Sequence, residues 1–351
     1  MIALPAHAGV DAAIESSVAR AATRANELGG GFTALAAALS RATRGGKRFR
    51  PALVVASFES FGGDATATPG VYPIAAAFEL LHTAFVVHDD VIDHDTVRRG
   101  IPNVAGEFRR RARANGADAA GAVLVGDAAA ILAGDLLLHE ALRLVAFADV
   151  DPVARERLYA IVDDAVYVSA AGELADVENS VVPERAMPED AFDVAFNKTA
   201  VYSFRAPLQA GAVLADAPDD AMRVLEIAGG RLGLAFQLVD DLIGAFGSPE
   251  QAGRESGGDL RECKRTPLVA LAQQTSSWAR VNDALAVAHT GPIAVREAQV
   301  ALRDSGAPVR LRRFIDETLD EVRTASLEPC LPSAAGLLLR DLADGVEGRI
   351  P

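Results

Sequence analysis

The feature of this sequence that most constrains its fold is the alternation of alanine-rich apolar stretches with short breaks that contain glycine or proline. Stretches such as 34–39 and 75–81 favour helix, because alanine has the highest helix propensity. Aromatic residues, which favour strands, make up only 5% of the chain. The breaks fall near residues 62–63, 69, 100–102, 183–188, 218, 247–258 and 291–292. The pattern predicts an all-α fold of about ten or more helices.

The composition indicates a globular chain with a large core. Hydrophobic residues make up 50% of the 351 residues and charged residues 23%, and no polar linker interrupts the sequence. We therefore expect a single domain over residues 1–351. The net charge of -14 argues against a nucleic-acid partner, which would require a broad basic surface.

The cellular setting is predicted from cysteine usage and from the first residues. Only two cysteines occur, Cys263 and Cys330, and residues 1–10 have neither a basic start nor an apolar run of signal-peptide length. We expect a cytoplasmic protein. We also expect no transmembrane segment, because apolar stretches such as 121–138 are interrupted, here by Asp127 and Asp135.

The first motif with chemical content is HDDVID at residues 88–93, which ends an apolar stretch. On a helix Asp89 and Asp93 project side by side, with Asp90 about 100° around the axis. Carboxylates this close repel one another unless a cation lies between them, and Mg²⁺ is usually held by one or two carboxylates together with substrate phosphates. The alternative is a solvated acidic turn at a helix end.

A second acidic pair favours the metal site over the solvated turn. Asp240 and Asp241 also follow an apolar stretch, residues 234–239, about 150 residues further along the chain. We expect the two acidic motifs to face each other across a cavity, which is the arrangement that a diphosphate clamp requires.

Basic side chains accompany the acidic motifs. The segment RGGKRFRP at residues 44–51 places four cations around a glycine pair, where backbone N–H groups can approach an anion closely. Arg98 and Arg99 follow the first acidic motif, and the segment DLRECKRT at residues 259–266 follows the second. Any one of these three basic segments could equally be an ordinary solvated surface loop. Their combination with the acidic motifs predicts a phosphate site.

Lysine usage supports the same interpretation. Of 34 Lys and Arg residues only Lys47, Lys198 and Lys264 are lysines, and each lies in or beside a candidate motif. Lysine is a compact point charge that arginine does not replace freely at a crowded phosphate site. His82 lies two helical turns before Asp89 and therefore on nearly the same face, although a lone helical histidine is more often structural.

Taken together, the motifs resemble the trans-isoprenyl diphosphate synthase (polyprenyl synthetase) family, and within it geranylgeranyl diphosphate synthases. The resemblance covers residues 45–267 most clearly. It rests on these segments in the family's order: GGKRFRP at 45–51, ELLH at 79–82, DDVID at 89–93, RRGIP at 98–102, Lys198-Thr199, Phe236-Gln237 with Asp240-Asp241, and KRT at 264–266.

The resemblance implies an isoprenoid synthase fold, a single large helical bundle with a central cavity, usually a homodimer. It implies that about three Mg²⁺ ions bind with substrate, and it gives each candidate residue a role. The metal residues are Asp89, Asp90, Asp93, Asp240 and Asp241. The residues for the allylic diphosphate are Arg98, Lys198, Thr199, Gln237 and Lys264. The residues for isopentenyl diphosphate are Gly46, Lys47, Arg50, His82 and Arg99. Those expected to be catalytic are Asp89, Asp93, Lys198, Asp240 and Lys264.

The implied reaction is magnesium-assisted ionisation of an allylic diphosphate, attack by the double bond of isopentenyl diphosphate, and loss of a proton. One position departs from the family pattern: Gly244 stands where the second motif commonly has a third aspartate. We expect weaker magnesium binding on that side, with activity retained through Asp240 and Asp241.

Product length is predicted from residues just before the first motif, which in the family form the floor of the product tunnel. Ala84 would leave room for a growing chain, whereas Phe85 would obstruct it. The prediction is the C20 product geranylgeranyl diphosphate, with farnesyl or longer products as alternatives. A class I terpene cyclase is disfavoured because its second motif normally has a later Ser and Glu. A non-catalytic partner subunit is disfavoured because such subunits often lose their aspartates.

Overall fold

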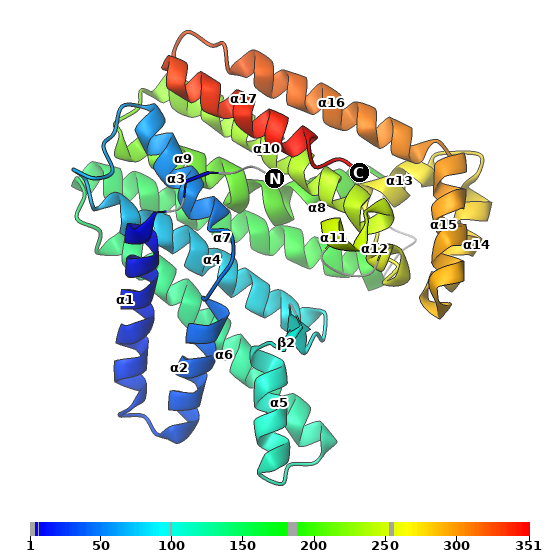
Figure 1. Ribbon diagram of the computed structural model, residues 1–351, viewed down its shortest axis with the longest axis horizontal. Coiled ribbons are helices and arrows are strands. Elements are labelled where there is room, and N and C mark those ends of the chain that lie inside the picture. The colour runs from blue at the N-terminus through cyan, green and yellow to red at the C-terminus, as the bar shows by residue number, and fades with distance from the viewer. Residues whose placement is uncertain (1–3, 6, 99, 182–187, 253–255) are drawn as a thin grey trace. The chain divides into compact units, whose positions relative to one another are not determined.

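The computed structural model describes residues 4–5, 7–98, 100–181, 188–252 and 256–351 (Figure 1). Within these ranges the chain is helical apart from turns, loops and one antiparallel pair of short strands, β1 (Val97–Arg98) and β2 (Ile101–Pro102). The predicted all-α fold class is confirmed.

The chain forms two compact units, which we describe separately. Among the described residues, the first unit comprises 4–160 and 210–216, and the second comprises 161–209 and 217–351. Two helices, α7 (Pro152–Val181) and α9 (Ala206–Leu214), contribute to both. That the whole chain is one domain stays a prediction.

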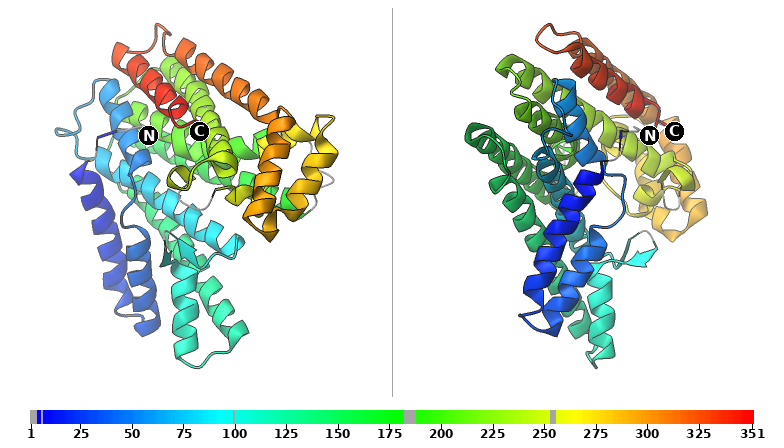
Figure 2. Two further views of the ribbon diagram at one scale, coloured as in Figure 1. Left: turned by 45° about the vertical axis from the view of Figure 1, so that its right-hand side comes forward. Right: turned by 60° about the vertical axis from the view of Figure 1, so that its left-hand side comes forward.

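The first unit is built around α4 (Val71–Ile92) and α6 (Ala119–Ala146), which pack along each other (Figure 2). Phe78 of α4 and Leu137 of α6 are both completely buried. Asn103 and Asp118 are the N-caps of α5 and α6, and their side chains accept backbone N–H bonds in the first turn, which fixes where each helix begins. The remaining helices of this unit are α1 (Ala8–Ala25), α2 (Gly30–Ala42), α3 (Phe49–Ser60) and α5 (Val104–Ala114).

By length and composition alone, α4 and α6 are each apolar enough to cross a membrane. They differ in burial. The most apolar window of α4 is 67% buried, as in the core helix of a folded unit, whereas that of α6 is 39% buried. An apolar face of α6 is therefore left uncovered within this chain.

The second unit is organised by α10 (Asp219–Phe246), which contacts the π-helix η2 (Phe196–Arg205) and also α16 and α17. Its other elements are α8 (Pro188–Ala195), α11 (Pro249–Ala252), α12 (Gly258–Arg261), α13 (Pro267–Gln273), α14 (Trp278–Val287), the 3₁₀ turn η3 (Ala288–Thr290), α15 (Pro292–Asp304), α16 (Ala307–Ala325) and α17 (Ser333–Glu347).

Two glycines allow α10, α7 and η2 to approach one another closely. A Cβ at Gly233 of α10 would lie 2.4 Å from the Ala200 Cα of η2, and one at Gly172 of α7 would lie 2.4 Å from the Lys198 backbone nitrogen. Only glycine fits such contacts. They place the polar side chains of the three helices within reach of one another.

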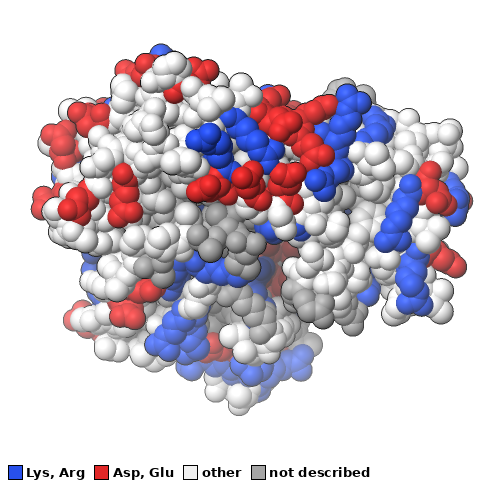
Figure 3. All heavy atoms as spheres, turned by 45° about the horizontal axis from the view of Figure 1, so that its top comes forward, with Lys and Arg blue, Asp and Glu red and all other residues white. Residues whose placement is uncertain are grey.

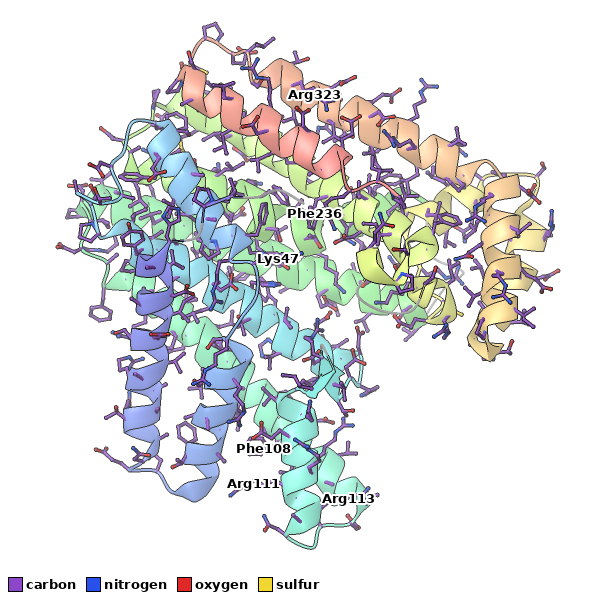
Figure 4. All side chains as sticks on the ribbon, viewed as in Figure 1. Lys47, Phe108, Arg111, Arg113, Phe236 and Arg323 are labelled. Atoms are coloured by element: carbon purple, nitrogen blue, oxygen red, sulfur yellow. The ribbon has the colours of Figure 1, made fainter. Side chains whose placement is uncertain are left out.

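Ion pairs link α16 and α17 at the surface. Arg323, labelled in Figure 4, contacts Asp320 at 2.9 Å, Asp344 at 2.8 Å and Glu347 at 2.5 Å. Acidic and basic side chains therefore adjoin over these helices (Figure 3). Single exposed pairs contribute little to stability, so the network mainly fixes how the two helices pack.

Candidate functional site

The first acidic motif lies at the C-terminal end of α4 in the first unit. The helix ends at Ile92, and the Asp93 N–H donates to the Asp89 carbonyl at 2.8 Å, so the two side chains lie one turn apart. The Asp89 side chain is 30% exposed and Asp93 is exposed. Asp89 and Asp93 are thus the members of this motif that are accessible to a metal ion.

Asp90 is buried and holds Arg98, which lies on β1. The Arg98 guanidinium donates to Asp90 Oδ1 at 2.7–2.8 Å and lies 3.6 Å from Asp89 Oδ2. Burial raises the pKa of Asp90, and the hydrogen bond from Arg98 offsets this only in part. Asp90 therefore fixes the position of Arg98, which was expected to contact the allylic diphosphate.

The glycine-containing basic loop connects α2 to α3. Gly45 and Gly46 have φ values of 73° and 84°, the left-handed region that favours glycine. Arg48, which sequence reasoning left without a role, holds this loop in place. Its guanidinium contacts Glu79 at 2.9 Å, Asp11 at 3.0 Å and the Thr43 carbonyl at 2.9 Å.

The other residues predicted to bind isopentenyl diphosphate surround this loop or lie on α4. Lys47 is exposed (Figure 4) and lines a groove of about 770 Å³ between α1 and α2. Arg50 lies in the first turn of α3, and His82 lies on α4, both half-buried. Arg99 lies outside the described residues. These four assignments stay predictions.

The two predicted chain-length residues lie on α4, before the first acidic motif. Ala84 is completely buried, whereas Phe85 is only half-buried. Of the two side chains, only that of Phe85 is exposed enough to contact a ligand.

The second acidic motif lies on α10 in the second unit, within a continuous hydrogen-bond chain. The Thr199 hydroxyl of η2 donates to Gln237 Oε1 at 2.8 Å, and Gln237 Nε2 donates to Asp241 Oδ1 at 2.9 Å. Gln237 and Asp241 are four residues apart on one face of α10. Three predicted site residues are therefore joined, and the amide of Gln237 orients the carboxylate.

Lys198 lies in the same π-helix, an irregularity that is frequent at functional sites. Its ammonium group lies 2.8 Å from Asp176 Oδ2 and 3.0 Å from Glu173 Oε2, both on α7. Sequence reasoning missed these two carboxylates, because neither lies in a motif. They hold the lysine in a fixed position within the second unit.

A cation from the C-terminal end of the chain also reaches this site. The Arg349 guanidinium forms an ion pair with Asp240 and stacks on the Phe236 ring, with its central carbon 4.0 Å from the ring centroid. Its Nη1 is buried and has no hydrogen-bond partner in the structure. Sequence reasoning missed Arg349, which lies beyond every recognised motif.

Asp241 lies where an ionised carboxylate is destabilised by burial. It is 6% exposed, and its Oδ2 is buried and accepts no hydrogen bond from the residues that the structure describes. Burial raises the pKa of Asp241 well above its ordinary value, and the charges of Asp259, Asp240 and Asp176 raise it further. A cation at this position would remove that penalty.

The donor set suits Mg²⁺ held jointly with a ligand. Across the described ranges, no three His, Cys, Asp or Glu side chains converge closely enough to hold a metal ion by themselves. Mg²⁺ commonly takes only one or two carboxylates and completes its shell with water and phosphate oxygens. The buried, unpartnered Oδ2 of Asp241 fits such an ion.

The remaining predicted residue, Lys264, follows α12. Its ammonium group lies 3.2 Å from Glu262 Oε2 and 4.0 Å from Asp259 Oδ1. Asp259 itself is buried beside α10. The two acidic motifs thus belong to different units, each with its own cations, and the expectation that they face each other stays a prediction.

Comparison with known proteins places the chain in a family. The family profile described as polyprenyl synthetase matches residues 33–301. A short chain isoprenyl diphosphate synthase of Methanothermobacter thermautotrophicus is 34% identical over 67% of this chain. That match spans 65% of the relative, a little under two thirds of its length. A (2E,6E)-farnesyl diphosphate synthase of Mycobacterium tuberculosis is 33% identical over 87% of this chain and 80% of its own.

A solved structure supports the same placement. The geranylgeranyl pyrophosphate synthase of Corynebacterium glutamicum, complexed with isoprenyl diphosphate and magnesium, has a TM-score of 0.87 and 27% identity, over 97% of both chains. The predicted isoprenoid synthase fold is confirmed by this likeness. The chain belongs to the polyprenyl synthetase family.

Proposed function

We propose that this protein is a magnesium-dependent trans-prenyltransferase that condenses isopentenyl diphosphate with an allylic diphosphate. The observation that carries the proposal is the second acidic motif. There a buried carboxylate with an unpartnered oxygen is oriented by Gln237 and lies in the same unit as Lys198. Family membership supports the same activity.

The residues proposed to bind Mg²⁺ are Asp89, Asp90, Asp93, Asp240 and Asp241. Bound Mg²⁺ would neutralise negative charge that develops on the leaving diphosphate. Of the first three, Asp89 and Asp93 are the more exposed, whereas Asp90 is paired with Arg98. We propose that Asp90 contributes mainly by positioning Arg98.

The cationic side chains have the second role in this proposal. Lys198, Lys264 and Arg98 would donate to the allylic diphosphate and stabilise it as the C–O bond breaks. The residues Gly46, Lys47, Arg50, His82 and Arg99 would bind isopentenyl diphosphate, whose double bond attacks the allylic cation. The departing diphosphate takes the proton that is lost, so the chain need not supply a base.

We propose geranylgeranyl diphosphate as the product. Ala84 and Phe85 lie before the first acidic motif on α4, and Phe85 is exposed enough to limit a growing chain. The name of the similar Corynebacterium glutamicum enzyme supports a C20 product, whereas that of the Mycobacterium tuberculosis relative supports C15.

Product analysis tests the activity and the length together. The purified chain is incubated with Mg²⁺, isopentenyl diphosphate and, in turn, dimethylallyl, geranyl or farnesyl diphosphate, and products are identified by mass. We expect a C20 diphosphate from each primer. Release of a hydrocarbon without isopentenyl diphosphate would instead identify a terpene cyclase. Turnover only after a second chain is added would identify a partner subunit.

We further propose that the protein acts as a cytoplasmic homodimer through the uncovered face of α6. Leu124, Ile131 and Leu132 are 70%, 46% and 53% exposed, and they recur at helical spacing. Light scattering should give the dimer mass for the parent and the monomer mass for Leu124→Asp. The matched control is Val309→Asp, which changes an equally exposed residue on α16 and should leave the dimer intact. A parental monomer would contradict the dimer.

A further inference from the structure

Two carboxylates of α7 contact the ammonium group of Lys198 together. That group donates to Asp176 Oδ2 at 2.8 Å, and it lies 3.0 Å and 3.2 Å from the two carboxylate oxygens of Glu173. Glu173 and Asp176 are three residues apart on α7, so they share one face of that helix. Carboxylates placed in this way repel each other, and an ammonium group that contacts both removes the repulsion. The three side chains therefore stabilise one another in this arrangement.

The backbone of Lys198 also lies against α7. Gly172 directly precedes Glu173, and a Cβ on it would lie 2.4 Å from the Lys198 nitrogen and 2.7 Å from the Asn197 carbonyl carbon. Lys198 belongs to the π-helix η2, a rare geometry that is frequent at functional sites. Both the backbone and the ammonium group of the lysine thus meet the same helix. The ammonium group has a defined position before any ligand binds.

The contacts with α7 leave the lysine accessible. The Lys198 side chain is 31% exposed, so a ligand can reach it while the two carboxylates stay in place. A lysine side chain has a flexible four-carbon stem, and holding it in advance reduces the entropy that is lost when it contacts a phosphate. A charge that is already in the correct position also contributes more to a reaction than one that must first be ordered.

Asp176 lies close to the second acidic motif as well. Burial raises the pKa of Asp241 most, and the charge of Asp176 adds to the rise, so the two carboxylates are near each other. Asp176, Lys198 and Asp241 all belong to the second unit. The lysine is therefore held beside the acidic motif, where the allylic diphosphate is proposed to bind.

We propose that Glu173 and Asp176 are positioning residues of the reaction, which orient the Lys198 ammonium group toward the leaving diphosphate and act only through it. This inference rests on the proposed function, and it deepens that function by naming the residues on which Lys198 depends. Neither carboxylate has to contact the substrate or a metal ion for this role.

Steady-state kinetics of the full chain with Mg²⁺, farnesyl diphosphate and isopentenyl diphosphate measure this role. Asp176→Asn and Glu173→Gln keep the shape of each side chain and remove its charge. We expect each to lower kcat/KM for farnesyl diphosphate about tenfold and to leave the KM for isopentenyl diphosphate unchanged. Asp176→Glu keeps the charge and should recover most of the loss. The matched control is Asp164→Asn, the same change at a carboxylate of α7 that pairs with Arg205 at 3.4 Å, and it should have no effect.

A double-mutant cycle with Lys198→Ala separates positioning from every independent role. In that background Asp176→Asn and Glu173→Gln should cause no further loss of kcat/KM, because the group that they orient is gone. A carboxylate that bound a metal ion, or that only supported the fold, would cost the same with and without the lysine. Circular dichroism and the melting temperature show that each variant is folded.

A binding measurement repeats the cycle without turnover. Isothermal titration calorimetry with Mg²⁺ and the unreactive analogue farnesyl thiolodiphosphate gives the affinity of each variant. We expect Asp176→Asn to lower the affinity about tenfold in the parent and to lower it no further in Lys198→Ala.

The outcomes separate this inference from the proposed function. A parental kcat/KM in folded Asp176→Asn or Glu173→Gln would overturn the role of that carboxylate. Losses of equal size with and without Lys198 would overturn positioning for both carboxylates, while turnover by the parent would leave the proposed function intact. A parent that neither turns over nor binds the analogue would overturn the proposed function and the inference together.

Discussion

Arg349 forms an ion pair with Asp240 and stacks on Phe236, so a residue close to the end of the chain occupies one carboxylate of the second acidic motif. In the metal-free protein the guanidinium neutralises a charge that Mg²⁺ would otherwise balance. The unpartnered Nη1 is a donor still available to a diphosphate oxygen.

This pair predicts a stability loss that depends on ligand. Arg349→Ala should lower the melting temperature in chelator by about 1–3 °C, because Asp240 loses its counter-ion. Adding Mg²⁺ with pyrophosphate should remove most of the difference, since the metal then balances Asp240. Arg349→Lys keeps the charge but loses the planar stack on Phe236. Its melting temperature in chelator should lie between those of the parent and Arg349→Ala. Equal losses with and without ligand would show that Arg349 is only a packing residue.

The raised pKa of Asp241 predicts a dependence of stability on pH in the metal-free protein. The folded carboxyl binds its proton more tightly than the unfolded one, so the folded state holds more protons between pH 3.8 and the raised pKa. The contribution of Asp241 to stability therefore falls as pH rises through that window. Thermal melts in chelator should show Asp241→Asn more stable than the parent at neutral pH, with the gap closing as the pH is lowered.

Asp64 provides a control of opposite sign. The hydrogen bond from the Thr66 hydroxyl lowers the pKa of Asp64, so Asp64→Asn should reduce stability at neutral pH. If Asp241→Asn also reduced stability at neutral pH, the buried charge of Asp241 would not be the cause of the predicted pH dependence of stability.

The contacts of Arg48 predict its role in binding isopentenyl diphosphate. Arg48→Ala removes the contacts to Glu79, Asp11 and Thr43 that hold the loop of residues 45–47. The KM for isopentenyl diphosphate should rise about tenfold with kcat changed little, because the loop binds and does not react. Arg24→Ala, a change at an exposed arginine in the last turn of α1, serves as the control and should leave both KM values unchanged. A change confined to the KM of the allylic substrate would show that the loop binds the allylic diphosphate and not isopentenyl diphosphate.

The exposure of Phe85 predicts control of product length. Phe85→Ala should shift the product from C20 to C25 or longer, because the ring would no longer limit the growing chain. Phe147→Ala, the same change at an exposed site, should leave the product as it is. Mass analysis of the products decides, and an unaltered distribution in Phe85→Ala would show that the tunnel floor lies elsewhere.

Much of this protein was predictable from local sequence. Alanine-rich stretches and Gly or Pro breaks predicted the all-α fold, and the ordered motifs predicted the family, because both depend on neighbours in the chain. Arg349 was not predicted as a site residue. Its partner Asp240 lies 109 residues away in the sequence, and only folding brings the two together.

The π-helix and the partners of Lys198 were missed for a similar reason. Nothing in the local pattern around Lys198 departs from an α-helix, and Glu173 and Asp176 resemble ordinary surface carboxylates in a long helix. The close approach of α7 and η2 at Gly172 brings them to the lysine. An unexplained glycine inside a helix was the available signal.

The most direct test of the central claim is the rate of diphosphate release from isopentenyl diphosphate and an allylic diphosphate, with Mg²⁺ and with chelator. The account predicts turnover in the parent that chelator abolishes. It also predicts that Asp89→Asn and Asp240→Asn each lower the rate by about a hundredfold or more, although they lie in different units. Parental rates in both variants, or a rate that chelator leaves unchanged, would contradict it.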